Sequence, residues 1–484
     1  FFSISLRLRR RVPAAPATKD IFCCPAAGGG AMTSRVNGAV RGLGAHYLAV
    51  CLLLALFMLT LMGAGSVIRV GLLGLLLCAV GVQQSSIRVD LWVLLPLVVY
   101  NLVSLVSSWF TYGNILYNYA PTQAILPVLY LLAACLEEGE LRWLRRMCGL
   151  WVCAAAALGI GEFVWRAVTS GTVRLGGLLG NPNAMGIFLV VGWFLLLDSS
   201  EESRLAALLR RGEPLVLAAL ALTLSMGSFL AMAAGILTLL ARERRRGSWS
   251  DTLALACRLL AGASLGVGAG LLIYAAARRT DVPWTCLLPA LYVLALAAYW
   301  DTFQRFLRAR PRMAAVIAGG GVLVAAAAVF VRPSALATFT ERLEMMRNGL
   351  GYIARHPLAG VGPYRWRVLN LEDGDKYFNT YHIHNVLIHV WAELGVLAAG
   401  ALAVIVLRCF RKKAEPALRA GFAAFCLHNL MDTSFFYLGI TGLTLLTAGN
   451  PRQGGRTLGP WTVRAIFILF AALFAFNLYS ARMG

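Results

Sequence analysis

Residues 381–407 read YHIHNVLIHVWAELGVLAAGALAVIVL, a short polar start that passes into a long, largely apolar stretch. That length matches the roughly 20 residues that a helix needs to cross the hydrocarbon core of a bilayer. The stretch follows a segment rich in arginine and glycine, RLEMMRNGLGYIARHPLAGVGPYRWR (342–367). The sequence therefore predicts membrane helices joined by a polar segment whose side chains carry chemistry.

The composition indicates the same class of protein. The 484 residues are 59% hydrophobic and 14% charged, with a mean hydropathy of +0.72. Too few polar residues remain to cover the surface of an ordinary soluble domain. We expect an all-α, polytopic membrane bundle of about 12–15 transmembrane helices. The apolar segments lie at about 45–65, 67–84, 90–108, 117–136, 147–166, 184–198, 214–226, 228–241, 252–276, 284–300, 313–331, 384–407, 418–433, 434–449 and 461–480.

The net charge of +22, almost all of it from arginine, first indicates cytoplasmic loops. The sequence contains no nucleic-acid-binding motif, so no nucleic-acid partner is expected. If residues 214–241 form two passes with a break at Ser225–Ser228, every dense basic cluster falls on one side, as the positive-inside rule requires. We therefore predict two passes, with these clusters inside: Arg142–Arg146, Arg204–Arg211, Arg242–Arg246, Arg305–Arg312 and Arg408–Lys413.

This topology places a long loop, about 332–383, on the external face, together with a smaller loop that holds Arg174. We predict a single polytopic domain over 32–484 with this external catalytic loop, after a disordered or misassigned extension over 1–31. The basic residues of the long loop break the rule that explains the other clusters, and they are Arg332, Arg342, Arg347, Arg355, Arg365, Arg367 and Lys376.

Neither a disulfide framework nor a metal site is expected. None of the eleven cysteines falls in the long loop, and no pair has zinc-ribbon spacing, so they are interpreted as small apolar helix residues. His382 and His384 have His-x-His spacing, and His389 follows them, which could suggest a metal site. However, no carboxylate or fourth ligand is well placed beside these histidines.

External arginines suit a phosphate-bearing lipid, because guanidinium groups match phosphate oxygens bidentately. Transfer of a sugar from a pyrophosphate needs neutralisation of that leaving group and a base for the acceptor hydroxyl. His384 is a candidate base, since histidine takes a proton near neutral pH; the alternative is that it only caps a helix.

Two other features favour structural roles. Gly360 and Gly362 permit positive φ, and a tight turn is a better interpretation than a cavity rim. His428 and Asp432, four apart in the predicted helix 418–433, would share a helix face, and we expect them to lock helices together rather than to catalyse.

Four motifs occur in order between about 174 and 398. They are Arg174 with GNPNAMG (180–186), the LTLS break (222–225), Arg342 upstream of HPLAGVG (356–362), and His384-Asn385 followed after nine residues by Gly395. Together they resemble the O-antigen ligase and O-antigen polymerase superfamily of bacterial membrane glycosyltransferases. Two positions depart from that pattern: Met226 stands where relatives often have arginine, and Ala398 where the family motif ends in glycine.

The resemblance implies an all-helical membrane fold with a catalytic chamber at the external face. It also implies inverting, metal-independent and cofactor-free transfer of a glycan from undecaprenyl pyrophosphate. Arg174 and Arg342 look like pyrophosphate-binding arginines, and His384 looks like the catalytic histidine. On this hypothesis, substrate binding also involves Arg347, Arg365, Arg367, Asn181, Asn183, Asn385, Gly360 and Gly362.

The acceptor stays open between a lipid-linked repeat, a lipid core, a wall polymer and a protein, and polymerase and ligase are favoured equally. Membrane lipid and a chain-length regulator are further partners that are compatible with the resemblance. The expected location is the bacterial cytoplasmic (inner) membrane, with the active site on the periplasmic side. The alternative is a transporter or flippase of lipid-linked saccharides, which would be expected to show internal repeats; the sequence shows no convincing repeat.

Overall fold

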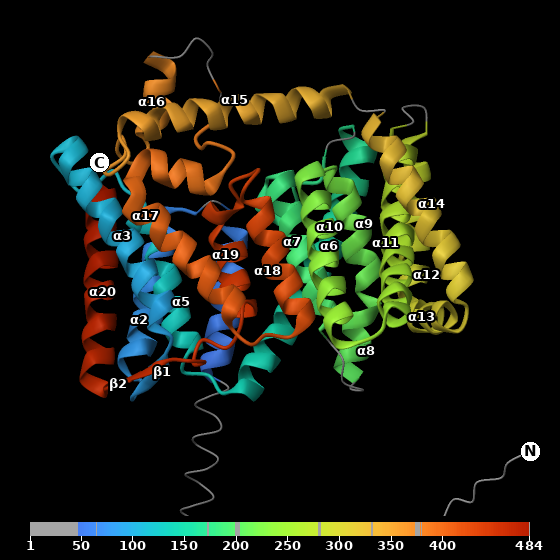
Figure 1. Ribbon diagram of the computed structural model, residues 1–484, viewed down its shortest axis with the longest axis horizontal. Coiled ribbons are helices and arrows are strands. Elements are labelled where there is room, and N and C mark those ends of the chain that lie inside the picture. Colours follow the sequence, from blue (N-terminus) through green and yellow to red (C-terminus); the bar gives the residue numbers. More distant parts are fainter. Residues whose placement is uncertain are drawn as a thin grey trace, which may run out of the picture. The chain divides into compact units, whose positions relative to one another are not determined.

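The structure, a computed structural model, describes residues 47–63, 65–171, 174–198, 204–278, 282–330, 333–372, 378 and 380–483. Within them, six helices are long and apolar enough to span a membrane, and one bent pair makes a seventh. Six shorter apolar helices of 10–17 residues accompany them. The predicted all-α, polytopic fold is confirmed (Figure 1). The predicted extension over 1–31 lies outside the described residues, as do Arg332 and Lys376.

The helices follow one another along the chain after an apolar helix at Tyr47–Leu61. Their bounds are α2 Val67–Val82, α3 Leu91–Tyr112, α4 Ala120–Gln123, α5 Ile125–Ala133, α6 Glu138–Thr169, α7 Pro182–Leu197, α8 Arg204–Arg211, α9 Glu213–Thr223, α10 Met226–Arg246, α11 Trp249–Ala277, α12 Leu287–Ala298, α13 Trp300–Ala309, α14 Pro311–Phe330, α15 Pro333–Arg355, α16 Arg365–Glu372, α17 Val386–Arg411, α18 Pro416–His428, α19 Leu438–Thr447 and α20 Pro460–Met483. Short 3-10 turns lie at Gly177–Leu179, Pro283–Cys286 and Ser434–Phe436.

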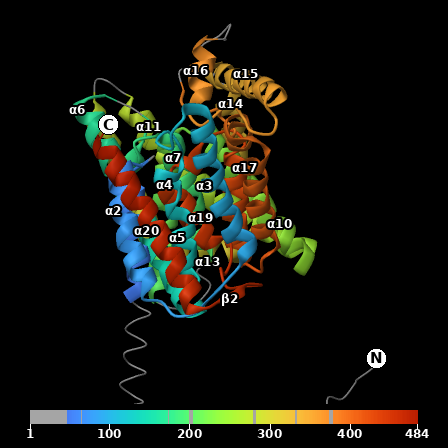
Figure 2. The same cartoon turned by 90° about the vertical axis from the view of Figure 1, so that its left-hand side faces the viewer.

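Two short strands are the sheet structure of the described residues. β1 (Ile87–Val89) pairs antiparallel with β2 (Arg456–Leu458), with Arg88 opposite Thr457. The pair joins the α2–α3 connection to the α19–α20 connection, and it lies at the end of the bundle away from α15 and α16 (Figure 2).

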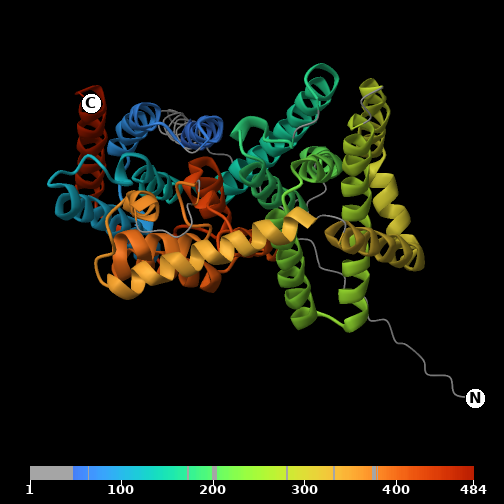
Figure 3. The same cartoon turned by 90° about the horizontal axis from the view of Figure 1, so that it is seen from above.

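The described residues between 333 and 383 are more regular than the predicted loop. α15 lies across one end of the bundle and packs on α17, with α16 following it (Figures 1 and 3). Met345, Tyr352 and Ile353 recur at helical spacing on α15 and are buried against Trp366 and Ile383. This amphipathic pattern explains why a polar connection between membrane helices is itself helical.

Two helix ends bear on the predictions. The break predicted near Ser225 is confirmed, because α9 ends at Thr223, Leu224 has a φ of 50°, and Ser225 caps α10. The prediction that a helix continues to residue 433 is wrong, since α18 ends at His428. Asn429 Oδ1 accepts bonds from Phe435 N and Ser434 Oγ, which stabilises a turn there. His428 and Asp432 therefore do not share a helix face.

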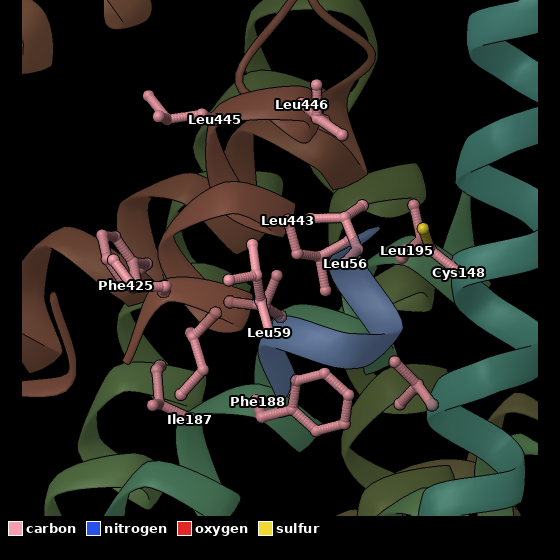
Figure 4. Close-up of a cluster of buried hydrophobic side chains, with 14 of the residues drawn as sticks. Leu56, Leu59, Cys148, Ile187, Phe188, Leu195, Phe425, Leu443, Leu445 and Leu446 are labelled. Atoms are coloured by element: carbon pink, nitrogen blue, oxygen red, sulfur yellow. The ribbon is translucent and has the colours of Figure 1, made fainter. Parts of the chain in front are cut away.

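The core is built from apolar side chains that interdigitate between helices. Figure 4 shows leucines of the helix Tyr47–Leu61 and of α19 meeting Ile187, Phe188 and Leu195 of α7. Close approach also depends on small residues, since a Cβ at Gly192 would meet Val152 Cγ1 at 2.2 Å.

At the strand end, the buried Asp90 carboxylate joins α3 to the end of α17. Asp90 caps α3 by accepting from Trp92 N at 3.1 Å. Its Oδ2 also accepts from Arg408 Nε at 2.7 Å and lies 3.4 Å from Lys412 Nζ. A carboxylate that is fully buried keeps its charge at low cost only when such partners surround it.

Replacement of Asp90 by alanine should therefore strongly destabilise the protein, by about 3–5 kcal/mol, because two cations lose their buried partner. The measurement is the melting temperature of the purified protein in detergent. Asp251→Ala is the control, since the Asp251 carboxylate also accepts a backbone bond at a helix start, from Ser248 N in the capping box of α11, but is exposed. An equal effect of the two substitutions would show that the buried ion pairs contribute nothing.

Candidate functional site

Three helix starts face one another at the α15 end of the bundle, and each begins with a side-chain cap. Asn181 Oδ1 accepts from Asn183 N and Ala184 N at the start of α7. Ser225 and Asn385 cap α10 and α17 in the same manner. The positive ends of the helix dipoles favour an anion in their vicinity.

The Asp432 carboxylate connects these helix starts to α15. Asp432 Oδ2 accepts from Arg342 Nη2 at 3.1 Å and from Asn183 Nδ2 at 3.0 Å. Arg342 Nη1 also donates to the carbonyl of Met431 at 2.6 Å. Arg174 is joined through Asn183, whose Oδ1 accepts from Arg174 Nη2 at 2.9 Å. The structure thus brings two of the predicted arginines into one hydrogen-bonded cluster.

His384 completes the cluster from the residue before the α17 cap. Its Nδ1 lies 3.8 Å from Asp432 Oδ2, and this nitrogen is buried without a hydrogen-bond partner among the described residues. The side chains of His384, Arg342 and Asp432 are 21%, 13% and 8% exposed. Burial alone would raise the pKa of the Asp432 carboxyl. The neighbouring His384, His428 and Arg342 outweigh burial and hold that pKa well below its usual range.

A chain of polar side chains extends the cluster toward α10. Ser228 Oγ donates to Ser225 Oγ at 2.9 Å and lies 3.4 Å from His428 Nε2. His428 Nδ1 is 3.0 Å from Ser434 Oγ. His428, expected only to lock helices, therefore lies within the site, although through a turn rather than a shared helix face.

A second buried constellation surrounds Glu393 of α17. Its carboxylate accepts from the Tyr119 hydroxyl and from the backbone N–H groups of Tyr364 and Trp366, at 2.8 and 3.1 Å. Tyr119 OH also lies 3.0 Å from His389 Nε2. Glu393 thereby holds the start of α16 against α17.

His382 belongs to this second constellation rather than to the Asp432 cluster. Its ring stacks on Phe436 at 4.2 Å and meets His389 edge-on at 4.9 Å. Burial, with the nearby His384, lowers the pKa of His382 to about 3. The three histidines do not converge, and the described residues contain no group of three or more metal-ligand side chains with metal-binding geometry.

The two glycines of the 357–364 turn pack against a break in α17. Gly395 has a φ of 79° inside α17, and the freed carbonyls of Ala392 and Glu393 accept from Val361 N and Gly362 N, each at 2.9 Å. A Cβ at Gly360 would meet the Glu393 backbone at 2.4 Å. Gly360 and Gly362 therefore form a docked turn, which agrees with the turn interpretation.

The other predicted substrate-binding residues lie on α15, on α16 and at the start of α17. Arg347 is exposed on α15, about 140° around the helix from Arg342. Arg365 and Arg367 lie on α16, where the Arg367 guanidinium stacks over the Tyr381 ring at 3.8 Å. Asn385 caps α17 and donates to the Leu430 carbonyl at 3.1 Å, so its contacts are structural.

Gly395→Ala should disrupt the site from a distance. The new Cβ would lie 2.0 Å from the Leu358 carbonyl oxygen, and alanine would have to adopt the positive φ. We expect a destabilisation of about 2 kcal/mol or more and release of the 357–366 segment. Gly400→Ala is the matched control, because its Cβ would meet nothing within 4 Å. Thermal melting and limited proteolysis test this, and equal behaviour of the two variants would contradict it.

Comparison with known protein families gives a match to part of this chain. Residues 215–403 match the family model described as O-antigen ligase. The matched segment contains the α9–α10 break, Arg342, His384 and Gly395, whereas Arg174, Asn183 and Asp432 lie outside it. No curated protein matches the chain at a significant level. The match over residues 215–403 thus supports the resemblance of this chain to the O-antigen ligase and O-antigen polymerase superfamily of membrane glycosyltransferases.

Proposed function

We propose that the protein transfers a glycan from an undecaprenyl-pyrophosphate donor to an acceptor hydroxyl at the external face of the membrane. The observation that carries this proposal is that Arg342 and His384 lie beside the same carboxylate, Asp432, in the part of the bundle where three helices begin. A phosphate-binding group and a base thus lie within reach of one substrate.

Diphosphate binding is supported by the charge at the site. Arg342 donates from two of the five N–H groups of its guanidinium, so further donors remain for phosphate oxygens. Arg174 adds a second guanidinium through Asn183, and the starts of α7, α10 and α17 add their dipoles. Neutralising the diphosphate stabilises it as the leaving group.

His384 is proposed to act as the general base. With Nδ1 directed toward Asp432, Nε2 takes the proton from the acceptor hydroxyl, and Asp432 stabilises the resulting imidazolium. The hydroxyl oxygen attacks the anomeric carbon from the face opposite the pyrophosphate. The bond from that carbon to the leaving oxygen breaks, and its electron pair goes to the diphosphate. The configuration is inverted, and no metal is needed if the arginines supply the charge.

The basic clusters at the opposite end of the bundle support an external location for the site. α17 carries His384 just before its first residue and ends at Arg411, roughly 35–40 Å away along the helix. Arg411 lines one cavity with Arg145, Arg242 and Arg246, so three of the predicted cytoplasmic clusters share that end. By the positive-inside rule, the end that carries the site is then the external one.

An apolar groove beside the site suits the polyprenyl tail. The groove has a volume of about 560 Å³ and is lined from α17 and α18, with Val386, Leu387 and Leu430 at the end near the site. Asn385 bonds to Leu430, which places the groove directly beside the α17 start. A lipid tail in this groove would leave its diphosphate near Arg342.

His384→Ala and Arg342→Ala should each lower the transfer rate by about 10²–10³-fold, since one removes the base and the other the leaving-group charge. The assay supplies defined lipid-pyrophosphate glycans to the reconstituted protein in chelator. It measures the new glycosidic bond together with the released undecaprenyl pyrophosphate.

His356→Ala and Arg355→Ala are the matched controls, since both residues are exposed on or beside α15. Wild-type rates for the His384 or Arg342 variants would refute the assigned roles. Movement of the donor across the bilayer without formation of a glycosidic bond would identify a flippase instead.

Asp432→Asn should retain the fold and lower the transfer rate, because the carboxamide no longer stabilises the imidazolium. Stability should also change with pH. A carboxyl whose folded pKa is depressed stabilises the fold above its unfolded pKa, about 3.9, and loses that contribution as the pH falls. The gap in melting temperature between wild type and variant should therefore narrow from pH 5 to pH 3. A constant gap would show that the charge of Asp432 is unimportant.

A further inference from the structure

A polar cavity lies at the end of α10 and α17 that is opposite to the Asp432 cluster. It has a volume of about 700 Å³, and its walls come from α6, α10, α18, the segment after α17 and the segment after α19. Only two acidic residues, Glu138 and Glu415, line it. Seven basic residues line it as well: Arg145, Arg242, Arg246, Arg411, Lys412, Lys413 and Arg419.

The innermost cations of this cavity bond to neutral oxygens as well as to carboxylates. Arg145, 6% exposed, donates from Nε and Nη2 to the Leu446 carbonyl at 3.1 and 3.0 Å, while Glu138 lies 3.7 Å from it. Lys412, 4% exposed, donates to the Tyr130 hydroxyl at 2.6 Å, and its Nζ lies 3.4 Å from the Asp90 carboxylate, which also pairs with Arg408. Because Asp90 faces both Lys412 and Arg408, one carboxylate serves two cations, and part of the positive charge at this end stays uncompensated.

Arg419 presents an unused donor. Its Nη1 and Nη2 donate to the carbonyls of Phe410 and Lys412, which fix the plane of the guanidinium. Its Nε is buried and has no hydrogen-bond partner among the described residues. A buried unsatisfied donor is costly, and it becomes favourable once an acceptor arrives.

The outer cations, in contrast, lack acidic partners among the described residues. In the described part of the chain, Arg242, Arg246 and Arg411 form no ion pair within 4.0 Å. The positive-inside rule explains the sign of the charge at this end of the bundle but not its convergence on one cavity. Like charges gathered in a hollow repel one another, and an anion bound between them would relieve that repulsion.

An apolar recess adjoins the basic cavity. Trp92, Val404 and Leu407 line a recess of about 380 Å³, and Arg408 and Arg411 complete it. Arg411 therefore contacts both the polar cavity and the apolar recess. A ligand with a phosphate and an acyl chain would match this combination, with the tryptophan at the boundary between headgroup and hydrocarbon.

We propose that the basic cavity binds the phosphate of an anionic membrane lipid, with the headgroup between Arg242, Arg246 and Arg411 and an acyl chain along Trp92. Phosphate oxygens would accept from the forked guanidinium donors, as basic pockets between membrane helices do for anionic headgroups. This site is separate from the Asp432 cluster and does not depend on the proposed transferase activity.

The test compares binding of lipid to the purified full chain. Wild-type protein is placed in nanodiscs of phosphatidylcholine containing a minor fraction of phosphatidylglycerol, and co-purifying lipid is quantified after exchange into detergent. We expect enrichment of phosphatidylglycerol over the bulk ratio. The double variant Arg242→Gln, Arg246→Gln should weaken this retention roughly ten-fold or more.

The double variant Arg244→Gln, Arg245→Gln is the matched control, because it makes the same charge change on the same helix end outside the cavity. Retained enrichment in this control supports a defined site. Absence of enrichment in wild type, or equal loss in both variants, overturns the proposal. In a second arm, inorganic phosphate at millimolar concentration is added. Its failure to displace the lipid supports the lipid source, whereas full displacement would identify free phosphate as the ligand and overturn the lipid assignment.

Discussion

The arrangement of the site depends on one buried carboxylate. Asp432 accepts bonds from Arg342 of α15 and Asn183 of α7, and it faces His384 at the start of α17. Three segments that are far apart in the sequence thus meet at one oxygen pair. Because Asp432 is nearly buried and its neighbours are cationic or polar donors, it stays ionised and keeps the guanidinium of Arg342 in place.

Much of the fold could be predicted from local patterns. Runs of apolar residues identified the membrane helices, and Asn181, Ser225 and Asn385 are residue types that cap helices, so breaks and starts near them follow from their chemistry. Charge counting required the break after α9, which the structure contains. The motifs around Arg174, Arg342 and His384 identified residues that lie together in the structure. Arg174 and His384 lie close to the starts of α7 and α17, and Arg342 lies on α15, which crosses that end of the bundle.

The remaining features depend on contacts between distant segments. Asp432 reads in the sequence as part of an apolar helix, and only the turn stabilised by Asn429 brings it out of α18 toward Arg342. Glu393 and Tyr119 are 274 residues apart, and no spacing rule connects them. In the sequence, only their charge groups Arg347, Arg365 and Arg367 with Arg342. The helical course of α15 and α16 separates them, and charge does not reveal which face of a helix a residue occupies.

The break in α17 explains why the number of residues between Asn385 and Gly395 matters. These nine residues form about two and a half helical turns, which separate the histidine from the point where the 357–364 turn docks. The number of these residues therefore sets both the distance and the rotation between His384 and the docked turn. Exchange of one apolar residue for another would leave the length of this helical segment unchanged. Insertion or deletion of a single residue would rotate its two ends relative to each other by about 100°. Such a shift would turn His384 away from Asp432, whichever residue is inserted or removed.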